Sequence, residues 1–488
     1  MRERVPVRLR LLGAAGVALI LAGWAAASLA AGSWFVPAPW TTIADTALLL
    51  ARRSTWGQIL VTLLRVITGF LSGYAAGIVA GIAMGARREL DALFKPLVLF
   101  FQGMPPLLWA IPLVALMGIG HLPTIVVIGL ITFPLVAVTI GEGMATLPRE
   151  YREMLAVFAP GFVPRTRELA LPHLAPFFAA SLKAGLVLAV KASVTAEYFG
   201  ANDGIGFQIQ AAYMSMRIRS LFSWAAVLIL VILLFNHLLP RIVRAGRAVS
   251  HSVARRSPVA CSVEDIRELK RIFTSLTATP RIALQEVSYA YPGKGPVLLD
   301  ASIEVSPREI AVVSGDSGIG KTTVLKLIAS LLKPSMGRIV CPQNVGFVFQ
   351  DDRLLPWRTA AENTALPLLY QGYARKNALC FAHYLLAEAG LAGEEERRPD
   401  ELSGGMKKRV ALARCFARLP DAILLDEPFS GLHGEARSLL WDMFLRLLSL
   451  HPVPTLIVTH YPEEIPSLAS VRRYALEGKP ARIVAVSR

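Results

Sequence analysis

A glycine-rich stretch, GDSGIGKTT at residues 315–323, restricts the fold of the second half of the chain more than any other feature. It follows the apolar run Ile310–Val313 and precedes Val324–Ile328, so the pattern predicts a strand, a tight turn and a helix start. The spacing fits G-x-x-x-x-G-K-[ST], a phosphate-binding loop whose backbone N–H groups surround a phosphate at a helix N-terminus. The residues expected to bind the nucleotide are Gly315, Asp316, Ser317, Gly318, Ile319, Gly320, Lys321, Thr322 and Thr323.

Two side chains of this loop have separate predicted tasks. Lys321 would reach the β- and γ-phosphates, and Thr322 would bind a Mg²⁺ ion. The alternative is a chance glycine turn before a helix, and the later motifs of the chain disfavour it. The chain is therefore expected to bind ATP with Mg²⁺.

The composition points to a membrane-spanning part. Of the 488 residues, 54% are hydrophobic and only 18% are charged, which is too apolar for a soluble enzyme. Six apolar spans are expected, at residues 11–31, 59–85, 96–119, 124–142, 176–197 and 224–239. A cleaved signal peptide is the alternative for the first span, but its uncharged run is longer than a signal-peptide core, which favours a retained span.

The net charge of +16 is better explained by membrane orientation than by nucleic-acid binding. Most basic residues of the first half lie between apolar spans, as cytoplasmic loops require. The N-terminus and residues 86–95, 143–173 and 241–247 then share the inner side, and both termini are cytoplasmic. The exceptions, on the outer side, are Arg52, Arg53, Arg217 and Arg219.

Two features stand out within the spans. Glycines at four-residue spacing form a stripe on one face of the second span, which permits close helix packing in lipid; they are Gly69, Gly73, Gly77, Gly81 and Gly85. Lys183 and Lys191 lie in the fifth span, where a charge is costly. Lys191 either faces the translocation path and attracts an anionic substrate or pairs with a neighbouring helix, whereas Lys183 is expected to extend to the headgroups.

The cysteines indicate neither a disulfide framework nor a zinc site. Cys261, Cys341, Cys380 and Cys415 are widely spaced and form no C-x-x-C pair, which suits a reducing cytoplasm.

From Arg281 the pattern changes to short β-rich runs and amphipathic helices. The expected domains are a transmembrane domain at 1–248, a linker at 249–280 and a nucleotide-binding domain at 281–488. The strand Ile423–Leu425 ends in two acids, of which Asp426 would hold Mg²⁺ and Glu427 would polarise the attacking water.

The order of motifs resembles the ATP-binding subunits of ABC transporters. Gln350 matches the Q-loop glutamine, a contact to Mg²⁺ and water that also couples to the permease, and His460 matches the switch histidine at the γ-phosphate. Tyr291 would stack on adenine, with Tyr289 as the alternative. The signature at 402–406 supplies Ser403, Gly404 and Gly405, which the resemblance assigns to the phosphate loop of a second copy in a head-to-tail dimer. His433 departs from the family, which usually has aspartate there, so slower or less coupled hydrolysis is expected.

The first half resembles the permeases of bacterial ABC importers. Their cytoplasmic EAA loop, which docks on the ATPase, is matched by Glu153, Ala156 and Leu171-Pro172, but Ala159 stands where glycine is usual. The motifs at 62–65 and 196–206 are similar to the nitrate/sulfonate/taurine branch.

The expected fold is an α-helical six-span membrane domain followed by an α/β P-loop ABC ATPase domain. The resemblance implies ATP-driven import of a small anionic or polar solute across the bacterial cytoplasmic (inner) membrane. Its partners would be a second copy or a similar half-transporter, an extracytoplasmic solute-binding protein and the lipid bilayer, with no nucleic acid. An ABC exporter predicts long cytoplasmic helices and no EAA-like loop. A regulatory subunit that binds ATP without transport is disfavoured by intact Lys321, Asp426, Glu427 and His460.

Overall fold

The computed structural model describes residues 7–158, 166–254, 261–274, 281–432, 434–462, 465 and 471–486. Its contacts form two compact units, Met1–Leu147 with His173–Arg255 and Pro148–Pro172 with Arg256–Arg488. Ala159 and His433 lie outside the described residues. The boundaries drawn from the sequence at 248 and 281 remain a prediction.

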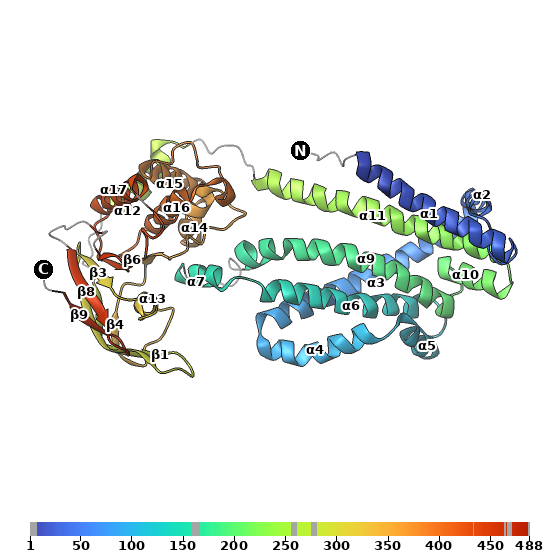
Figure 1. Ribbon diagram of the computed structural model, residues 1–488, viewed down its shortest axis with the longest axis horizontal. Coiled ribbons are helices and arrows are strands. Elements are labelled where there is room, and N and C mark those ends of the chain that lie inside the picture. Colours follow the sequence, from blue (N-terminus) through green and yellow to red (C-terminus); the bar gives the residue numbers. More distant parts are fainter. Residues whose placement is uncertain are drawn as a thin grey trace. The chain divides into compact units, whose positions relative to one another are not determined.

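The first unit is helical, as its long apolar runs require. Its helices are α1 (Val7–Ala31), α2 (Pro39–Leu50), α3 (Arg53–Ala86), α4 (Arg88–Gly103), α5 (Pro106–Met117), α6 (His121–Ala145), α9 (Leu171–Gly200), α10 (Ile205–Met214) and α11 (Ile218–Ala254) (Figure 1). Within the described residues, five helices are long and apolar enough to cross a membrane, and a sixth span results if α4 and α5 count as one. These two meet at 92°, because Pro105 and Pro106 interrupt the helix.

The glycine stripe of α3 packs closely on α6, as predicted. A Cβ atom added at Gly77 would lie 2.7 Å from the Val136 Cβ and 2.8 Å from the Phe133 carbonyl oxygen. At Gly69 it would lie 2.7 Å from the Ile125 carbonyl oxygen. Only hydrogen at these positions allows the two backbones to approach so closely.

A buried polar network joins the two permease motifs that the sequence singled out. Arg65 is 2% exposed and Glu197 0% exposed, and their side chains form an ion pair of 3.0 Å. Glu197 also accepts hydrogen bonds of 2.9 Å from the Thr62 hydroxyl and the Gly206 N–H. Arg65 further pairs with Asp203. The network therefore ties α3 to α9 and to the start of α10.

Lys183 and Lys191 lie on the exposed side of α9. Neither takes part in a hydrogen bond or ion pair among the described residues, so the pairing with a neighbouring helix that was the alternative for Lys191 does not occur within this unit. Ala180, Ala184 and Val187, at helical spacing between and beside them, are exposed or half-buried. One face of α9 thus carries two lysines that this copy of the chain does not cover.

The second unit contains the α/β domain. Its strands are β1 (Ile282–Ala290), β2 (Pro296–Val305), β3 (Ile310–Ser314), β4 (Met336–Val340), β5 (Val345–Val348), β6 (Ala422–Asp426), β7 (Thr455–Thr459), β8 (Val471–Glu477) and β9 (Arg482–Ala485). One sheet has the order β5-β6-β7-β3-β8-β9, parallel except for the β8–β9 pair, and a smaller antiparallel sheet has the order β2-β1-β4.

Helices flank the larger sheet, and most of them contribute side chains to the main core of this unit. They are α7 (Arg149–Val157), α12 (Val263–Thr274), α13 (Lys321–Ile328), α14 (Ala360–Tyr370), α15 (Arg375–Glu388), α16 (Gly404–Ala417) and α17 (Glu435–Leu450). Helix α12 lies within the predicted linker, yet Leu269 and Phe273 are buried in the ATPase core. The ring of Phe273 stacks on His451 with centroids 4.6 Å apart.

The expectation of no disulfide is wrong, because Cys261 and Cys380 are bonded. They are 119 residues apart in the sequence, so their spacing gave no signal. The packing of α12 on α15 brings their Cα atoms to 5.4 Å, within the range that a disulfide needs. Cys341 and Cys415 are free thiols.

Candidate nucleotide site and coupling contacts

The carboxyl ends of four parallel strands bring the candidate residues together. The phosphate loop follows β3, Gln350 follows β5, Glu427 follows β6 and His460 follows β7. Because β5, β6, β7 and β3 are neighbours in one parallel sheet, these segments leave the same edge. Residues separated by up to 145 positions, Gly315 to His460, thus share one site.

The phosphate loop has the backbone that its glycines were expected to allow. Gly318 and Gly320 have φ angles of 75° and 121°, in the region that disfavours side chains. Gly320 precedes α13, which begins at Lys321. The Lys321 ammonium donates hydrogen bonds to the carbonyl oxygens of Gly315 (2.6 Å) and Asp316 (2.9 Å). Burial lowers its pKa, while the charges of Glu427 and Asp426 oppose that shift.

Thr322 and Asp426 form an oxygen pair beside the loop. The Thr322 hydroxyl donates a hydrogen bond of 3.2 Å to the Asp426 carboxylate. Burial raises the pKa of Asp426 to about 6, although this hydrogen bond lowers it. Hard oxygen donors fit Mg²⁺, which usually takes one or two protein ligands and fills its shell with water and phosphate. The donor set therefore fits a magnesium ion held jointly with a nucleotide.

Glu427, His460 and Gln350 are in mutual contact. A Glu427 carboxylate oxygen lies 3.0 Å from the His460 Nε2, and the other accepts a hydrogen bond of 3.2 Å from the Gln350 amide. The Lys321 Nζ lies 3.2 Å from both ring nitrogens of His460. Glu427 has a φ of 48°, a conformation that costs energy and is found at functional sites when the surroundings enforce it.

The two tyrosines differ in position. Tyr289 is 7% exposed and belongs to the core. Tyr291 is half-buried, and its hydroxyl lies 3.2 Å from the Thr323 hydroxyl of the phosphate loop. The geometry favours Tyr291 as the residue beside a nucleotide, and the stacking role stays a prediction.

The signature residues do not join this cluster within one copy. Ser403 caps α16, and its hydroxyl accepts a hydrogen bond of 3.3 Å from the Met406 N–H. Ser403 and Gly404 are exposed and Gly405 is half-buried. In the part of the chain that the structure describes, no hydrogen bond links them to the phosphate loop. Helices α16 and α13 occupy different parts of this unit (Figure 1).

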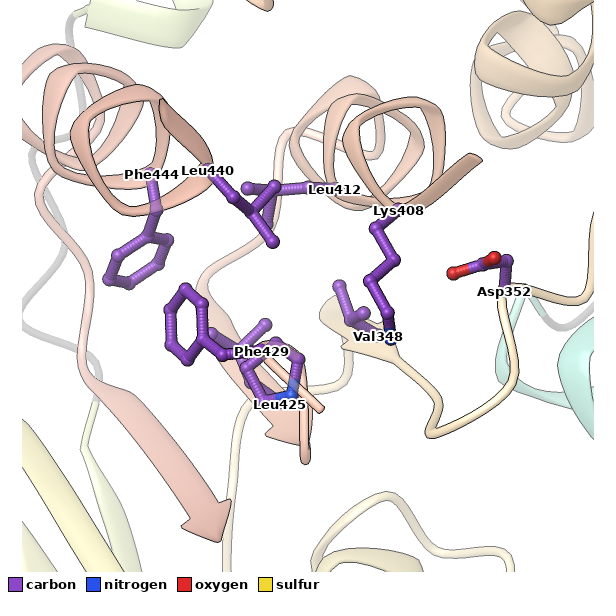
Figure 2. Close-up of a pocket in the computed structure, with 9 residues that line it drawn as sticks. Val348, Asp352, Lys408, Leu412, Leu425, Phe429, Leu440 and Phe444 are labelled. Carbon is purple, nitrogen blue, oxygen red and sulfur yellow. The ribbon is translucent and has the colours of Figure 1, made fainter. Parts of the chain in front are cut away.

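A small cavity lies behind β6 and is not the nucleotide site. Figure 2 shows it walled by Leu425, Phe429, Leu440 and Phe444, with Lys408 on one side. Its volume of about 10 Å³ holds at most one water molecule. It is a packing gap between β6, α16 and α17, so the open strand edge remains the candidate site.

Helix α7 of the 148–172 segment is attached to this site by Glu153. Its carboxylate accepts hydrogen bonds of 3.0 Å from Lys326, on α13, and 3.1 Å from Arg353, after β5. Arg353 also donates to the Glu150 carbonyl oxygen at 3.1 Å. Burial alone would raise the pKa of Glu153, but its bonds and charge pairs with Lys326 and Arg353 hold it below the ordinary value.

Further contacts flank Glu153 on both sides. Tyr151 meets Trp357 edge to face, with ring centroids 6.4 Å apart. Phe158 lies against Tyr370, and Glu168 pairs with Arg358. The 148–172 segment therefore docks on the ATPase domain through the two charged contacts of Glu153, and aromatic contacts lie on either side of them.

Arg414 is a site residue that the sequence did not reveal. It is 1% exposed, and its guanidinium donates to the carbonyl oxygens of Asp352 (2.6 Å) and Arg353 (2.8 Å). Burial lowers its pKa to about 10. It fixes the loop that carries Gln350 and Arg353. The available signal was one arginine inside the apolar run Val410–Ala417.

Comparisons with known proteins agree with both units. The family model described as "ABC transporter" matches residues 298–430, and "Binding-protein-dependent transport system inner membrane component" matches residues 73–245. The chain is 39% identical over 212 residues to a taurine import ATP-binding protein of Pseudomonas entomophila, covering 42% of this chain and 82% of that one. It is 36% identical over 201 residues to a formylaminopyrimidine import ATP-binding protein of Halalkalibacterium halodurans, covering 41% and 80%. A solved dimeric ATP-binding cassette, MJ0796 with ADP and Pi, is 26% identical and covers 41% of this chain and 96% of its own, with a TM-score of 0.38.

The fold and the site define a multi-pass membrane protein with an ATP-hydrolysing domain. The chain belongs to the ABC transporter family, and it joins an importer-type permease and an ABC ATPase in one polypeptide of a bacterial inner membrane. Its ATP hydrolysis is coupled to transport.

Proposed function

We propose that two copies of this chain, or one copy and a similar half-transporter, form an ATP-driven importer of a small anionic solute such as a sulfonate. The observation that carries the proposal is the attachment of Glu153 to Lys326 and Arg353. This side chain belongs to the segment between α6 and α9, and its partners lie on two elements of the ATP site. A solute-binding protein would deliver the solute on the outer side, with both termini of the transporter in the cytoplasm.

The site residues divide the work of hydrolysis. Lys321 and the loop N–H groups bind phosphate oxygens, and Glu427 accepts a proton from the attacking water while His460 and Gln350 orient its carboxylate. Thr322 and Asp426, with Gln350, would hold Mg²⁺, which supplies positive charge to the phosphates. Tyr291 would face the adenine.

The second copy is needed because each cluster is only half a site. Ser403, Gly404 and Gly405 sit at the N-terminus of α16, where N–H groups can bind a phosphate. Ser403 and Gly404 are exposed, which leaves the start of α16 free to face the phosphate loop of the other copy. The family's dimeric arrangement and the absence of a link within the described part of one copy support this assignment.

The substrate class rests on α9 and on the relatives. A charge facing lipid near the bilayer centre costs about 3 kcal/mol, so the exposed Lys191 favours a water-filled path shared with the second copy, while Lys183 extends to the headgroups. A cation on such a path favours an anion. The taurine import function of the related ATP-binding proteins agrees with a sulfonate.

Uptake by proteoliposomes tests this proposal. Transport of a radiolabelled sulfonate panel, taurine included, is measured with the cognate binding protein and internal ATP. Lys191→Gln is expected to lower the uptake of anions at least tenfold while basal ATPase activity persists, and Lys95→Gln, in the predicted cytoplasmic loop, serves as the matched control. Unchanged uptake by Lys191→Gln contradicts the anionic path, and the absence of any ATP-dependent uptake contradicts import.

A further inference from the structure

A groove between α1, α2 and α11 has no task in the proposed transport cycle. Its volume is about 920 Å³, and its lining is almost entirely apolar. Leu21 and Trp24 come from α1, Ile43 from α2, and Phe222 and Leu230 from α11. Trp24 fixes one wall, because its ring stacks on Phe222 and its N–H donates to the Pro37 carbonyl oxygen at 3.0 Å.

A second pocket, of about 640 Å³, continues the groove at one end. The two are adjacent at three places in the chain, since Pro37, Thr41 and Ser220 line the pocket close in sequence to Val36, Thr42 and Phe222 of the groove. The pocket also contains Arg217 and Arg219. An apolar channel thus ends at a cationic opening.

The two arginines differ in their partners. Arg219 forms a bidentate pair with Asp45, at 2.9 and 3.0 Å. The exposed Arg217 side chain has no hydrogen bond or ion pair with the described residues. The preceding Met216 has a φ of 52°, which is unusual for a residue with a side chain. The tight turn that it forms places Arg217 directly before α11.

The groove has the length of one lipid leaflet. Phe222 and Leu233 are eleven residues apart on α11, which is about 16 Å at 1.5 Å per residue. The hydrocarbon core of a bilayer is about 30 Å thick. Trp34 and Trp40, 84% and 61% exposed, lie near the cationic end, and exposed tryptophans mark the headgroup level.

One buried polar group inside the groove lacks a partner. The Thr42 hydroxyl lines the groove and is 2% exposed, and no acceptor or donor within the described residues reaches it. Such a group costs about 1–3 kcal/mol when it remains unpaired. An ester oxygen at the glycerol level of a lipid would satisfy it.

We propose that this groove binds an anionic phospholipid, with its phosphate at Arg217 and Arg219 and an acyl chain against α11. The position of these arginines explains why the ligand is anionic. They lie at the N-terminal end of α11, and the chain leaves the opposite end of this helix toward the ATPase, so the arginines are on the outer side. Positive residues are not expected on that outer side of a bacterial permease. The ligand therefore comes from the outer leaflet.

The test uses the full-length protein in phosphatidylcholine nanodiscs with increasing phosphatidylglycerol, and native mass spectrometry counts the lipids retained. Arg217→Gln/Arg219→Gln is expected to weaken phosphatidylglycerol retention at least fivefold, from about 1 kcal/mol per basic residue. Arg52→Gln/Arg53→Gln removes two exposed arginines that do not line the groove, so retention should match the wild type. Ala226→Trp, which fills the groove, should remove bound lipid of both headgroups.

Four results would overturn the proposal. Equal retention by Arg217→Gln/Arg219→Gln and the wild type shows that no headgroup binds there, and equal losses in both arginine pairs show general surface attraction. Displacement of the lipid by free glycerol phosphate shows a soluble phosphate site. If Ala226→Trp disrupts the dimer and leaves lipid retention unchanged, a second copy occupies the groove instead.

Discussion

Removal of the Glu153 carboxylate should uncouple transport from ATP hydrolysis. In Glu153→Ala, Lys326 and Arg353 lose a partner that both contact at about 3 Å. A hydrogen bond between charged groups contributes about 1.5–3 kcal/mol when buried. Glu153 is 36% exposed, so solvent screening reduces each contact to about 1 kcal/mol. The pair of contacts then contributes about 2 kcal/mol, equivalent to about a thirtyfold change in an equilibrium constant.

The assay compares ATP hydrolysis and solute uptake in the same proteoliposomes. Glu153→Ala should keep basal hydrolysis within about twofold, since the nucleotide ligands are intact, and lose stimulation by the binding protein together with most uptake. Glu150→Ala is the matched control, because this exposed residue of α7 offers Arg353 only its backbone carbonyl. The exchange Glu153→Arg with Arg353→Glu should restore part of the coupling. Normal uptake per ATP in Glu153→Ala would refute this reasoning.

Five further outcomes follow from the site and the packing. Glu427→Gln should bind Mg²⁺–ATP but lose at least a hundredfold in hydrolysis. Asp426, with its pKa raised to about 6, must be ionised to hold Mg²⁺, so Mg²⁺–ATP affinity should fall about tenfold per unit below pH 6 while binding in EDTA stays flat. Because the same pKa is raised in the folded state, the stability of the nucleotide-free protein falls as the pH rises from about 4 to 6. Asp426→Asn should remove this pH dependence of the melting temperature. Gly77→Ala should destabilise the membrane unit by about 1–3 kcal/mol in a melt, whereas Gly57→Ala, with open space around it, should not. Cys261→Ser should match the reduced wild type and lose about 2–5 kcal/mol relative to the oxidised protein.

The sequence predicted those parts of the fold that local patterns encode. A glycine loop between a strand and a helix, an apolar strand ending in Asp426 and Glu427, and four-residue glycine spacing each have one dominant structural solution. The structure accordingly contains β3, β6 and the close α3–α6 packing. These features need no knowledge of distant neighbours.

The parts that the sequence missed all depend on contacts between distant segments. The disulfide needed α12, a helix within the predicted linker, to pack on α15, and no local pattern specifies that partner. Arg414 stands alone in the apolar run Val410–Ala417, but its task depends on the loop after β5, whose carbonyl oxygens it binds. The choice between Tyr289 and Tyr291 depended on where the chain directly after β1 meets the phosphate loop, since the Tyr291 hydroxyl lies 3.2 Å from that of Thr323.

The position of Glu153 explains why one side chain can link two processes. Lys326 lies on the helix that begins at the phosphate loop, and Arg353 lies on the loop after β5, which also carries Gln350 and is fixed by Arg414. Any change at either side of the nucleotide therefore alters the geometry that Glu153 must satisfy. Coupling of this kind is reciprocal, so a movement of the 148–172 segment must also alter the affinity for nucleotide. Glu153→Ala should abolish the dependence of ATP affinity on the solute-loaded binding protein, and a dependence that persists in this variant would assign the coupling to the flanking Glu168–Arg358 pair instead.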